Sequence, residues 1–252
     1  GRTARRAFEL DDVEIVPSRR TRSSKDVSTA WQIDAYRFDI PLVTHPTDAI
    51  VSPSTAVAVG RLGGLGVLNA EGLWARHANT PDLLAAGVEI LVVQGTIVSA
   101  EHVARDGEPL NLKRFIAELD VPVIAGGVGD HRTAMHLMRT GAAGVIVGYG
   151  QSGGVTSTDS VLGIGVPMAT AIVDAAAARR DYLDETGGRY VHVIADGGVH
   201  VSGDIAKAIA CGADAVMLGA PLAAATEAPG KGLYWTAAAA HPSLPRSRVV
   251  PA

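Results

Sequence analysis

Two glycine-containing segments have the residue types needed to bind a phosphorylated ligand. "DGGVHVSGD" begins at Asp196, "GAPLA" begins at Gly219, and each follows a short apolar run. Gly197, Gly198 and Gly219 would let backbone N–H groups approach an anion closely, and a helix expected near Ser202 would add its positive end. Asp196 could accept hydrogen bonds from a ribose diol. Alternatively, the glycines only make tight turns between strands and helices.

A third segment, "GYGQSGGVTSTDSVLGIGVP" from Gly148 to Pro167, is typical of a loop that surrounds a ligand. It contains no cysteine, histidine or lysine. Its hydroxyl groups are poor nucleophiles at neutral pH unless a base activates them. The single cysteine of the chain, Cys211, lies in "AIACGADAV", and we interpret it as a small apolar helix residue.

The histidines give weaker signals. His45, in "VTHPTDAI", follows an expected strand and could face a ligand, but a histidine before a proline in a loop is more often structural. His192 alternates with valines on another expected strand, which favours a packed histidine. Other histidines show no metal-ligand spacing with nearby carboxylates, so we expect no metal site.

The elements that would position these residues repeat one pattern, in which a helix ends at glycine and an apolar run follows. "LLAAGVEILVVQG", "MRTGAAGVIVGYG" and "IACGADAVMLGAP" show it. Such runs indicate strands covered on both faces, so the repeat is a β/α module in a parallel sheet. Strands are expected at 41–44, 66–69, 89–94, 121–125, 144–147, 190–195 and 215–218. Helices are expected at 130–140, 168–186 and 202–211, with Asp130 and Ser202 as N-caps.

The fold class predicted from this pattern is α/β, a (β/α)8 TIM barrel. Seven strands are counted where a closed barrel needs eight. Residues 69–89 leave room for about one helix, whereas a strand-helix-strand crossover needs several tens of residues. We therefore expect one strand-helix segment to be missing from the sequence near Asn79 and Thr80. The chain is predicted to be a single domain, 1–252, with an extension at 1–40 packed on a barrel at 41–252.

Composition narrows the functional class. Hydrophobic residues make up 47% of the 252 residues but aromatics only 4%, which is typical of tightly packed α/β layers. The net charge of -4 disfavours a nucleic-acid partner. No apolar run approaches the roughly 20 residues that span a bilayer, so we expect a cytoplasmic protein without a membrane partner. One cysteine excludes an intrachain disulfide and a cysteine-rich zinc site.

Several motifs occur in the order seen in the IMP dehydrogenase and GMP reductase family. They are "DDVEIVPSRRTRSSKDVSTAWQIDAYRFDIPLVTHPTDAI", "GRLGGLGVLN", "GVPMATAI", "VIADGGVHVSGDIAKAIACGADAVMLGAPLA" and "EAPG". The chain resembles this family over nearly its whole length, and most closely its actinobacterial members without regulatory CBS domains. The resemblance implies a barrel, usually tetrameric, that binds a purine nucleotide (IMP, XMP or GMP) and uses NAD.

The resemblance also implies roles for individual residues. Asp196 would hold the ribose hydroxyls, and Gly198 and Gly219, with Gly197 beside them, would bind phosphate. Ala220 stands where the family usually has a phosphate-binding serine, which removes a donor worth about 1 to 3 kcal/mol.

Two further positions differ from the family's motifs. Thr47 replaces the methionine of "SPMD" and is assigned to the substrate site. Gln94 replaces the aspartate of "DxAHG" and is assigned, with Gly148 and Gly150, to the cofactor site.

In IMP dehydrogenases a cysteine in a "GxGxGSxCTTR" loop attacks C2 of IMP, a hydride passes to NAD, and the covalent intermediate is hydrolysed. Counting forward from Gly148 puts this cysteine at Val155, and counting back from "GIGVP" puts it at Thr156. Neither is cysteine, so Thr156 and Thr158 are the candidate catalytic residues. The replacement also argues against the monovalent-cation site that carbonyls of this loop form in the family.

Three functions follow from the resemblance. The first is NAD-dependent oxidation of IMP to XMP in GMP biosynthesis. The second is a noncatalytic purine-nucleotide sensor or partner subunit that kept the binding face without the nucleophile. The third is a GMP reductase-like activity, which needs the same cysteine.

Overall fold

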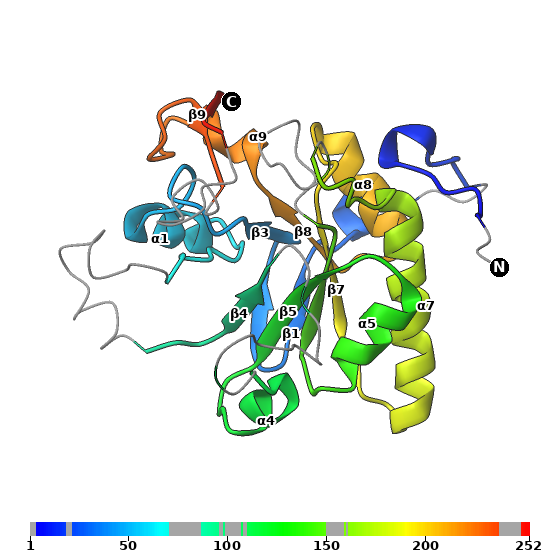
Figure 1. Ribbon diagram of the computed structural model, residues 1–252. Helices are drawn as coiled ribbons and strands as arrows, with labels where there is room; N and C mark the ends of the chain where they lie inside the picture. Colours follow the sequence, from blue (N-terminus) through cyan, green and yellow to red (C-terminus); the bar gives the residue numbers. More distant parts are fainter. Residues whose placement is uncertain are drawn as a thin grey trace.

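The computed structural model is an α/β fold built around one parallel sheet (Figure 1). It describes residues 4–18, 22–70, 87–95, 98, 107, 110–149, 159, 161–236 and 248–252. The sheet has six strands in the order β3-β8-β7-β6-β5-β4. Their bounds are β3 Leu42–Thr44, β4 Leu91–Gln94, β5 Val123–Val128, β6 Gly144–Val147, β7 His192–Asp196 and β8 Ala215–Leu218. The first strand of the sheet pairs with the last, which is the arrangement that closes a barrel.

In the part of the chain that the structure describes, the sheet is incomplete on one side. Leu65 makes a single parallel bridge to Val43 of β3 and so marks the second barrel strand, although the expected strand at 66–69 does not form. The next strand in the described part of the chain is β4, which pairs there with β5. An open position between Leu65 and β4 agrees with the expectation of a missing strand-helix segment. Asn79 and Thr80, where we expected the break, lie outside the described residues.

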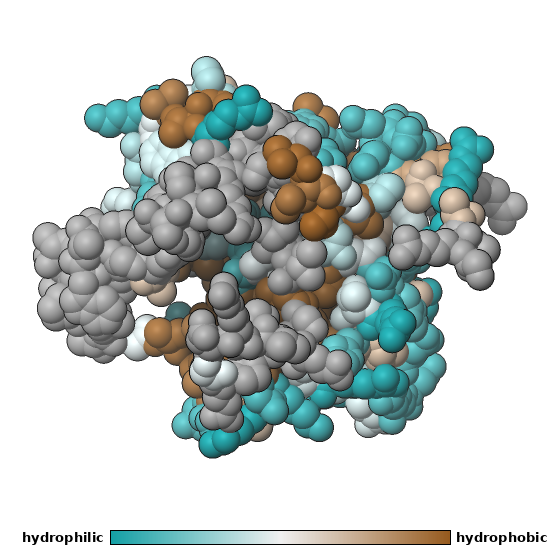
Figure 2. All heavy atoms as spheres, in the orientation of Figure 1, coloured by the Kyte–Doolittle hydropathy of each residue, from teal (hydrophilic) through white to brown (hydrophobic). Residues whose placement is uncertain are grey.

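Helices cover the outer face of the sheet. The main ones are α5 His131–Met138, α7 Met168–Thr186 and α8 Ser202–Cys211, and the bounds of α7 and α8 are those expected from the sequence. Their inner faces bury alanine, methionine and leucine against the outward side chains of the strands, and hydrophilic side chains cover much of their outer side (Figure 2). Shorter elements are α1 Pro53–Arg61, α4 Leu112–Ala117, α9 Ala220–Ala223, the 3-10 turns Leu10–Asp12 and Ser24–Asp26, and the paired strands β9 Leu233–Tyr234 and β10 Val250–Pro251.

The helix caps were partly predicted. The Asp130 carboxylate accepts a hydrogen bond from the first turn of α5, as expected. The expectation for Ser202 is wrong, because Val201 occupies the N-cap position of α8. The Asp204 carboxylate instead accepts the backbone N–H groups of His200 and Val201 at 2.9 and 3.1 Å. A carboxylate satisfies two donors there and its charge complements the positive end of the helix.

The barrel interior is filled by alternating side chains. Ile124, Ile146 and Ile194 point inward and pack with the hairpin formed by β1 Trp31–Ile33 and β2 Tyr36–Phe38. The Trp31 ring lies 6.1 Å from the ring of His192, the first residue of β7. The hairpin therefore closes the N-terminal end of the barrel, and the C-terminal strand ends are left for a ligand.

The N-terminal extension packs on the start of α7. The Glu9 carboxylate accepts the Met168 N–H at 2.9 Å, and the Phe8 N–H donates to Thr170 Oγ1 at 2.8 Å. Leu10 is buried in the same cluster as Met168. This segment thus fixes the helix that follows the 148–167 loop.

In the part of the chain that the structure describes, no helix has the length and apolar character required to cross a bilayer.

Candidate functional site

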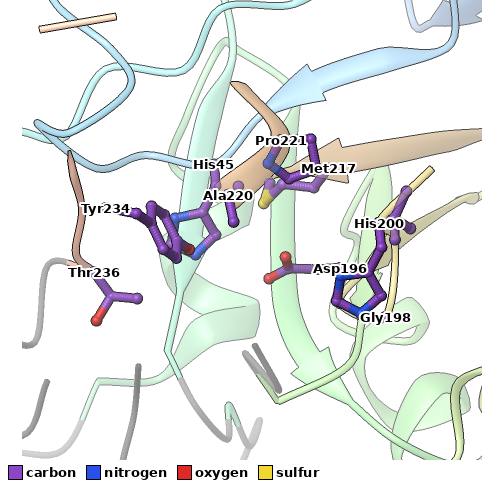
Figure 3. Close-up of a pocket in the computed structure, with 12 residues that line it drawn as sticks. His45, Asp196, Gly198, His200, Met217, Ala220, Pro221, Tyr234 and Thr236 are labelled. Atoms are coloured by element: carbon purple, nitrogen blue, oxygen red, sulfur yellow. The ribbon is translucent and has the colours of Figure 1, made fainter. Parts of the chain in front are cut away.

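A depression opens at the C-terminal ends of the strands (Figure 3). Four parts of the chain line it, namely the loop after β3, the end of β7 with its loop, the end of β8 with α9, and the segment around β9. The lining residues are His45, Asp196–His200, Met217, Gly219–Pro221, Tyr234 and Thr236. The depression therefore lies where barrels of this kind bind ligands.

Asp196 is the charged side chain at the centre of this depression. It is the last residue of β7 and points inward, and only 6% of its surface is exposed. Burial raises the pKa of its carboxyl above the usual value, and the charge of His45 and a hydrogen bond from Gln94 offset only part of this effect. In Figure 3 the carboxylate lies between His45 and Tyr234 on one side and His200 on the other.

Gln94 holds one oxygen of this carboxylate. Its Nε2 donates to Asp196 Oδ2 at 2.8 Å and lies 3.4 Å from Met217 Sδ. An ionised carboxylate only accepts hydrogen bonds, so the Gln94 amide must present its NH2 group to it. Gln94 Oε1 then faces away, buried and without a hydrogen-bond partner among the described residues. Asp196 Oδ1 likewise accepts no hydrogen bond from this part of the chain.

The structure brings the predicted phosphate-binding residues together. Gly197, Gly198, Gly219 and Ala220 all line the depression. Gly197 and Gly198 have φ values of 122° and 69°, which favour glycine. The N–H groups of Gly197, Gly198 and Gly219 donate to no acceptor in the described part of the chain. These donors could therefore bind an anion without losing a protein hydrogen bond.

Gly219 also needs to be glycine because of its neighbour. A Cβ at this position would lie 2.7 Å from Tyr234 Oη. Tyr234 is almost fully buried, so its ring forms a firm wall of the depression beside the Gly219 loop.

Gly148 lies directly against the Asp196 backbone. A Cβ on Gly148, whose φ is 121°, would come within 2.0 Å of the Asp196 carbonyl oxygen. The missing side chain lets the end of β6 approach the end of β7 and so supports Asp196 from behind. Gly150, Val155, Thr156 and Thr158 lie outside the described residues.

Thr47 and Ala220 have contrasting surroundings. The Thr47 hydroxyl is buried and donates to the Trp235 carbonyl at 2.5 Å, which ties the loop after β3 to the segment around β9. Ala220 is the first residue of α9 and lines the depression without a polar side chain.

Sequence reasoning missed part of this site. His45 was considered mainly structural, yet its ring lines the depression. Met217 could have been found, because alternation along β8 places it inward with Ala215. Nothing in the sequence around Tyr234 pointed to the site, since it lies in an irregular stretch outside the repeat.

The only thiol of the chain is far from this depression. Cys211 is the last residue of α8, so it precedes β8 and lies toward the N-terminal end of the barrel. Burial raises the pKa of its thiol. It is therefore neither positioned nor activated as a nucleophile for a ligand beside Asp196.

Comparison with known proteins agrees with this architecture. The model of the "IMP dehydrogenase / GMP reductase domain" family matches residues 75–241. An uncharacterized oxidoreductase of Mycolicibacterium smegmatis is 60% identical, over 99% of this chain and 84% of the relative. An inosine-5′-monophosphate dehydrogenase of Haemophilus influenzae is 40% identical over 69% of this chain and 32% of that protein.

A crystal structure of an IMP dehydrogenase/GMP reductase-like protein from Corynebacterium glutamicum has a TM-score of 0.89 and 49% identity. The match covers 100% of this chain and 82% of the C. glutamicum chain.

The comparison with the M. smegmatis relative bears on the open position between Leu65 and β4 in the sheet. The alignment with the M. smegmatis relative spans 314 positions, whereas this chain has 252 residues, so at least 62 positions of the alignment have no residue here. A strand-helix unit with its loops accounts for several tens of residues. The barrel is thus of the family's kind, with a segment of the relative absent, and the chain belongs to the IMP dehydrogenase/GMP reductase family.

Proposed function

We propose that this chain binds a purine ribonucleotide 5′-monophosphate in the depression at the C-terminal strand ends, with IMP as the leading candidate. The phosphate would accept hydrogen bonds from the backbone of the two glycine loops, and the ribose hydroxyls would donate to Asp196. One observation carries this proposal, namely the buried carboxylate of Asp196 beside three backbone N–H groups that have no acceptor among the described residues. XMP and GMP share the phosphate and the ribose and would use the same groups.

The reaction we propose on this site is the NAD-dependent oxidation of IMP to XMP in GMP biosynthesis, by a cytoplasmic homotetramer of one barrel domain with its N-terminal extension. Gln94 Oε1 is a buried acceptor with no partner in the described part of the chain, so it suits a ligand that brings a hydroxyl donor, such as a ribose of NAD. When bound, NAD would accept the hydride from the nucleotide. Gln94 would orient both ligands, because its amide nitrogen already holds Asp196.

A second candidate is a nucleotide-binding sensor or partner subunit without turnover. The position of Cys211 favours it, because the chain's one thiol lies away from the depression and cannot serve as the nucleophile. A thiol is partly ionised at neutral pH, whereas the hydroxyls of Thr156 and Thr158 need a base to act as nucleophiles. A GMP reductase-like activity would meet the same difficulty.

Binding and turnover can be tested separately. We expect calorimetry to show IMP binding that Asp196→Ala abolishes or weakens at least tenfold. Equal binding by the variant would exclude the proposed site. Turnover is followed at the nicotinamide absorbance band with IMP and NAD, and in the reverse sense with GMP and NADPH. Activity gained only in Val155→Cys or Thr156→Cys would support the noncatalytic candidate.

A further inference from the structure

His45 differs from His131 and His192 in the hydrogen bonds of its ring. His131 Nε2 lies 2.7 Å from Asp181 Oδ2, and His192 Nδ1 lies 3.3 Å from the Ala143 carbonyl oxygen. Each of these rings is held by the protein. His45 Nδ1 is buried and has no hydrogen-bond partner among the described residues. In the described part of the chain, no hydrogen bond of the protein therefore holds the His45 ring.

The backbone of His45 is nevertheless fixed in the site. Its N–H donates to the Leu218 carbonyl at 2.9 Å, which holds the loop after β3 against the end of β8. The ring lines the depression and faces the region of the Asp196 carboxylate (Figure 3). It is close enough for its positive charge to lower the pKa of that carboxyl.

The proton of the neutral ring has a preferred nitrogen. A proton on Nδ1 would be a buried donor with no acceptor among the described residues, which is unfavourable. The neutral ring therefore carries its proton on Nε2, the nitrogen that is not enclosed. Across the depression, Gln94 donates to Asp196 Oδ2, and Oδ1 accepts no hydrogen bond from the described part of the chain. The site thus offers one donor and one acceptor to the same ligand.

A hydroxyl group satisfies both, since it donates one hydrogen bond and accepts others. We propose that His45 is a ligand-binding residue of this site, whose Nε2–H donates to the oxygen of a ribose hydroxyl that in turn donates to Asp196 Oδ1. The inference rests on the proposed function, because it requires a ribonucleotide in the depression. It identifies the ribose, and not only the phosphate, as a group selected by this chain's own side chains.

The arrangement also has a pH dependence. The titratable side chains that line the depression are His45, Asp196, His200 and Tyr234, and His45 is the one that acts on the Asp196 carboxyl. Protonated His45 favours ionised Asp196, which is the form that accepts hydrogen bonds from a ribose. Removal of His45 would raise the pKa of Asp196, so IMP affinity should begin to fall at a higher pH as the solution is acidified.

The test uses calorimetry on the full chain with IMP and with its 2′-deoxy and 3′-deoxy analogues. We expect His45→Ala to weaken IMP binding about threefold to tenfold, the loss of one net hydrogen bond. The affinity for one of the two deoxy analogues should be the same in His45→Ala and in the wild type. His45→Gln, which restores a donor, should recover part of the loss. His131→Ala, on the outer face of α5, is the matched control and should change none of these affinities.

The possible failures are distinguishable. If His45→Ala weakens IMP and both analogues by the same factor, or weakens none of them, His45 does not hold a ribose hydroxyl. An unchanged pH profile of IMP affinity in His45→Ala would contradict its action on Asp196. If Asp196→Asn binds IMP as tightly as the wild type, the proposed function itself fails, and the role of His45 fails with it.

Discussion

Replacing Gly148 by alanine tests how closely the ends of β6 and β7 approach each other beneath the site. The φ of 121° disfavours any residue with a side chain, at a cost of about 1 to 3 kcal/mol. The new methyl carbon would also lie 2.0 Å from the Asp196 carbonyl oxygen, and forcing an extra methyl group into a packed region costs about 1 to 3 kcal/mol. We therefore expect Gly148→Ala to lower the free energy of unfolding by about 2 to 6 kcal/mol, the sum of both effects.

Gly187→Ala separates the two contributions. Gly187 ends α7 with a φ of 69°, and a Cβ there meets nothing within 4 Å. It should cost only the backbone strain, about 1 to 2 kcal/mol. Urea denaturation followed by circular dichroism measures both variants. Equal destabilisation by Gly148→Ala and Gly187→Ala would refute the close approach of Gly148 to Asp196.

Two further predictions concern acidic residues outside the ligand contacts. The pKa of the Asp204 carboxyl lies below its usual value. Burial raises this pKa, but the effect is outweighed by hydrogen bonds from the N–H groups of His200 and Val201 and by the charge of Lys207. The stability that this carboxylate contributes is therefore complete above a pH of about 4, the usual pKa of an aspartate, and is lost as the pH falls through the folded-state pKa. Denaturation between pH 7 and pH 3 should show a smaller loss of stability in Asp204→Asn than in the wild type; parallel curves would contradict this. Asp214 accepts hydrogen bonds from Arg179 Nη1 and the Tyr190 hydroxyl, both at 2.6 Å, so Asp214→Asn should lower the unfolding free energy by about 2 to 3 kcal/mol and Tyr190→Phe by about 1 kcal/mol. An Asp214→Asn effect no larger than that of Tyr190→Phe would show that the ion pair with Arg179 adds nothing.

The sequence predicted the regular parts of the barrel well because their signals are local. Helices at 168–186 and 202–211 and strands at 144–147 and 215–218 form within the expected bounds. Each combines a continuous apolar run or an amphipathic stretch with a glycine stop, and tertiary packing does not oppose these preferences. The strand expected at 66–69 depends instead on a neighbouring strand that the described residues do not supply, and only the bridge of Leu65 remains.

The site was predicted where one continuous sequence motif contains the relevant residues, as at Asp196 and the glycines around it. The contacts that span the barrel could not be predicted. Gln94 and Asp196 are 102 residues apart in the sequence, and His45 reaches the same depression from the first barrel strand. Their proximity follows from the order of the strands and from which side chains alternate inward. Neither property is visible in a single segment.

A crystal structure of the full chain with IMP tests the central claim most directly. We predict that the phosphate lies within hydrogen-bond distance of the Gly198 and Gly219 nitrogens, and that a ribose hydroxyl lies between Asp196 Oδ1 and His45 Nε2. A nucleotide bound elsewhere, or one whose ribose does not contact Asp196, would contradict the account.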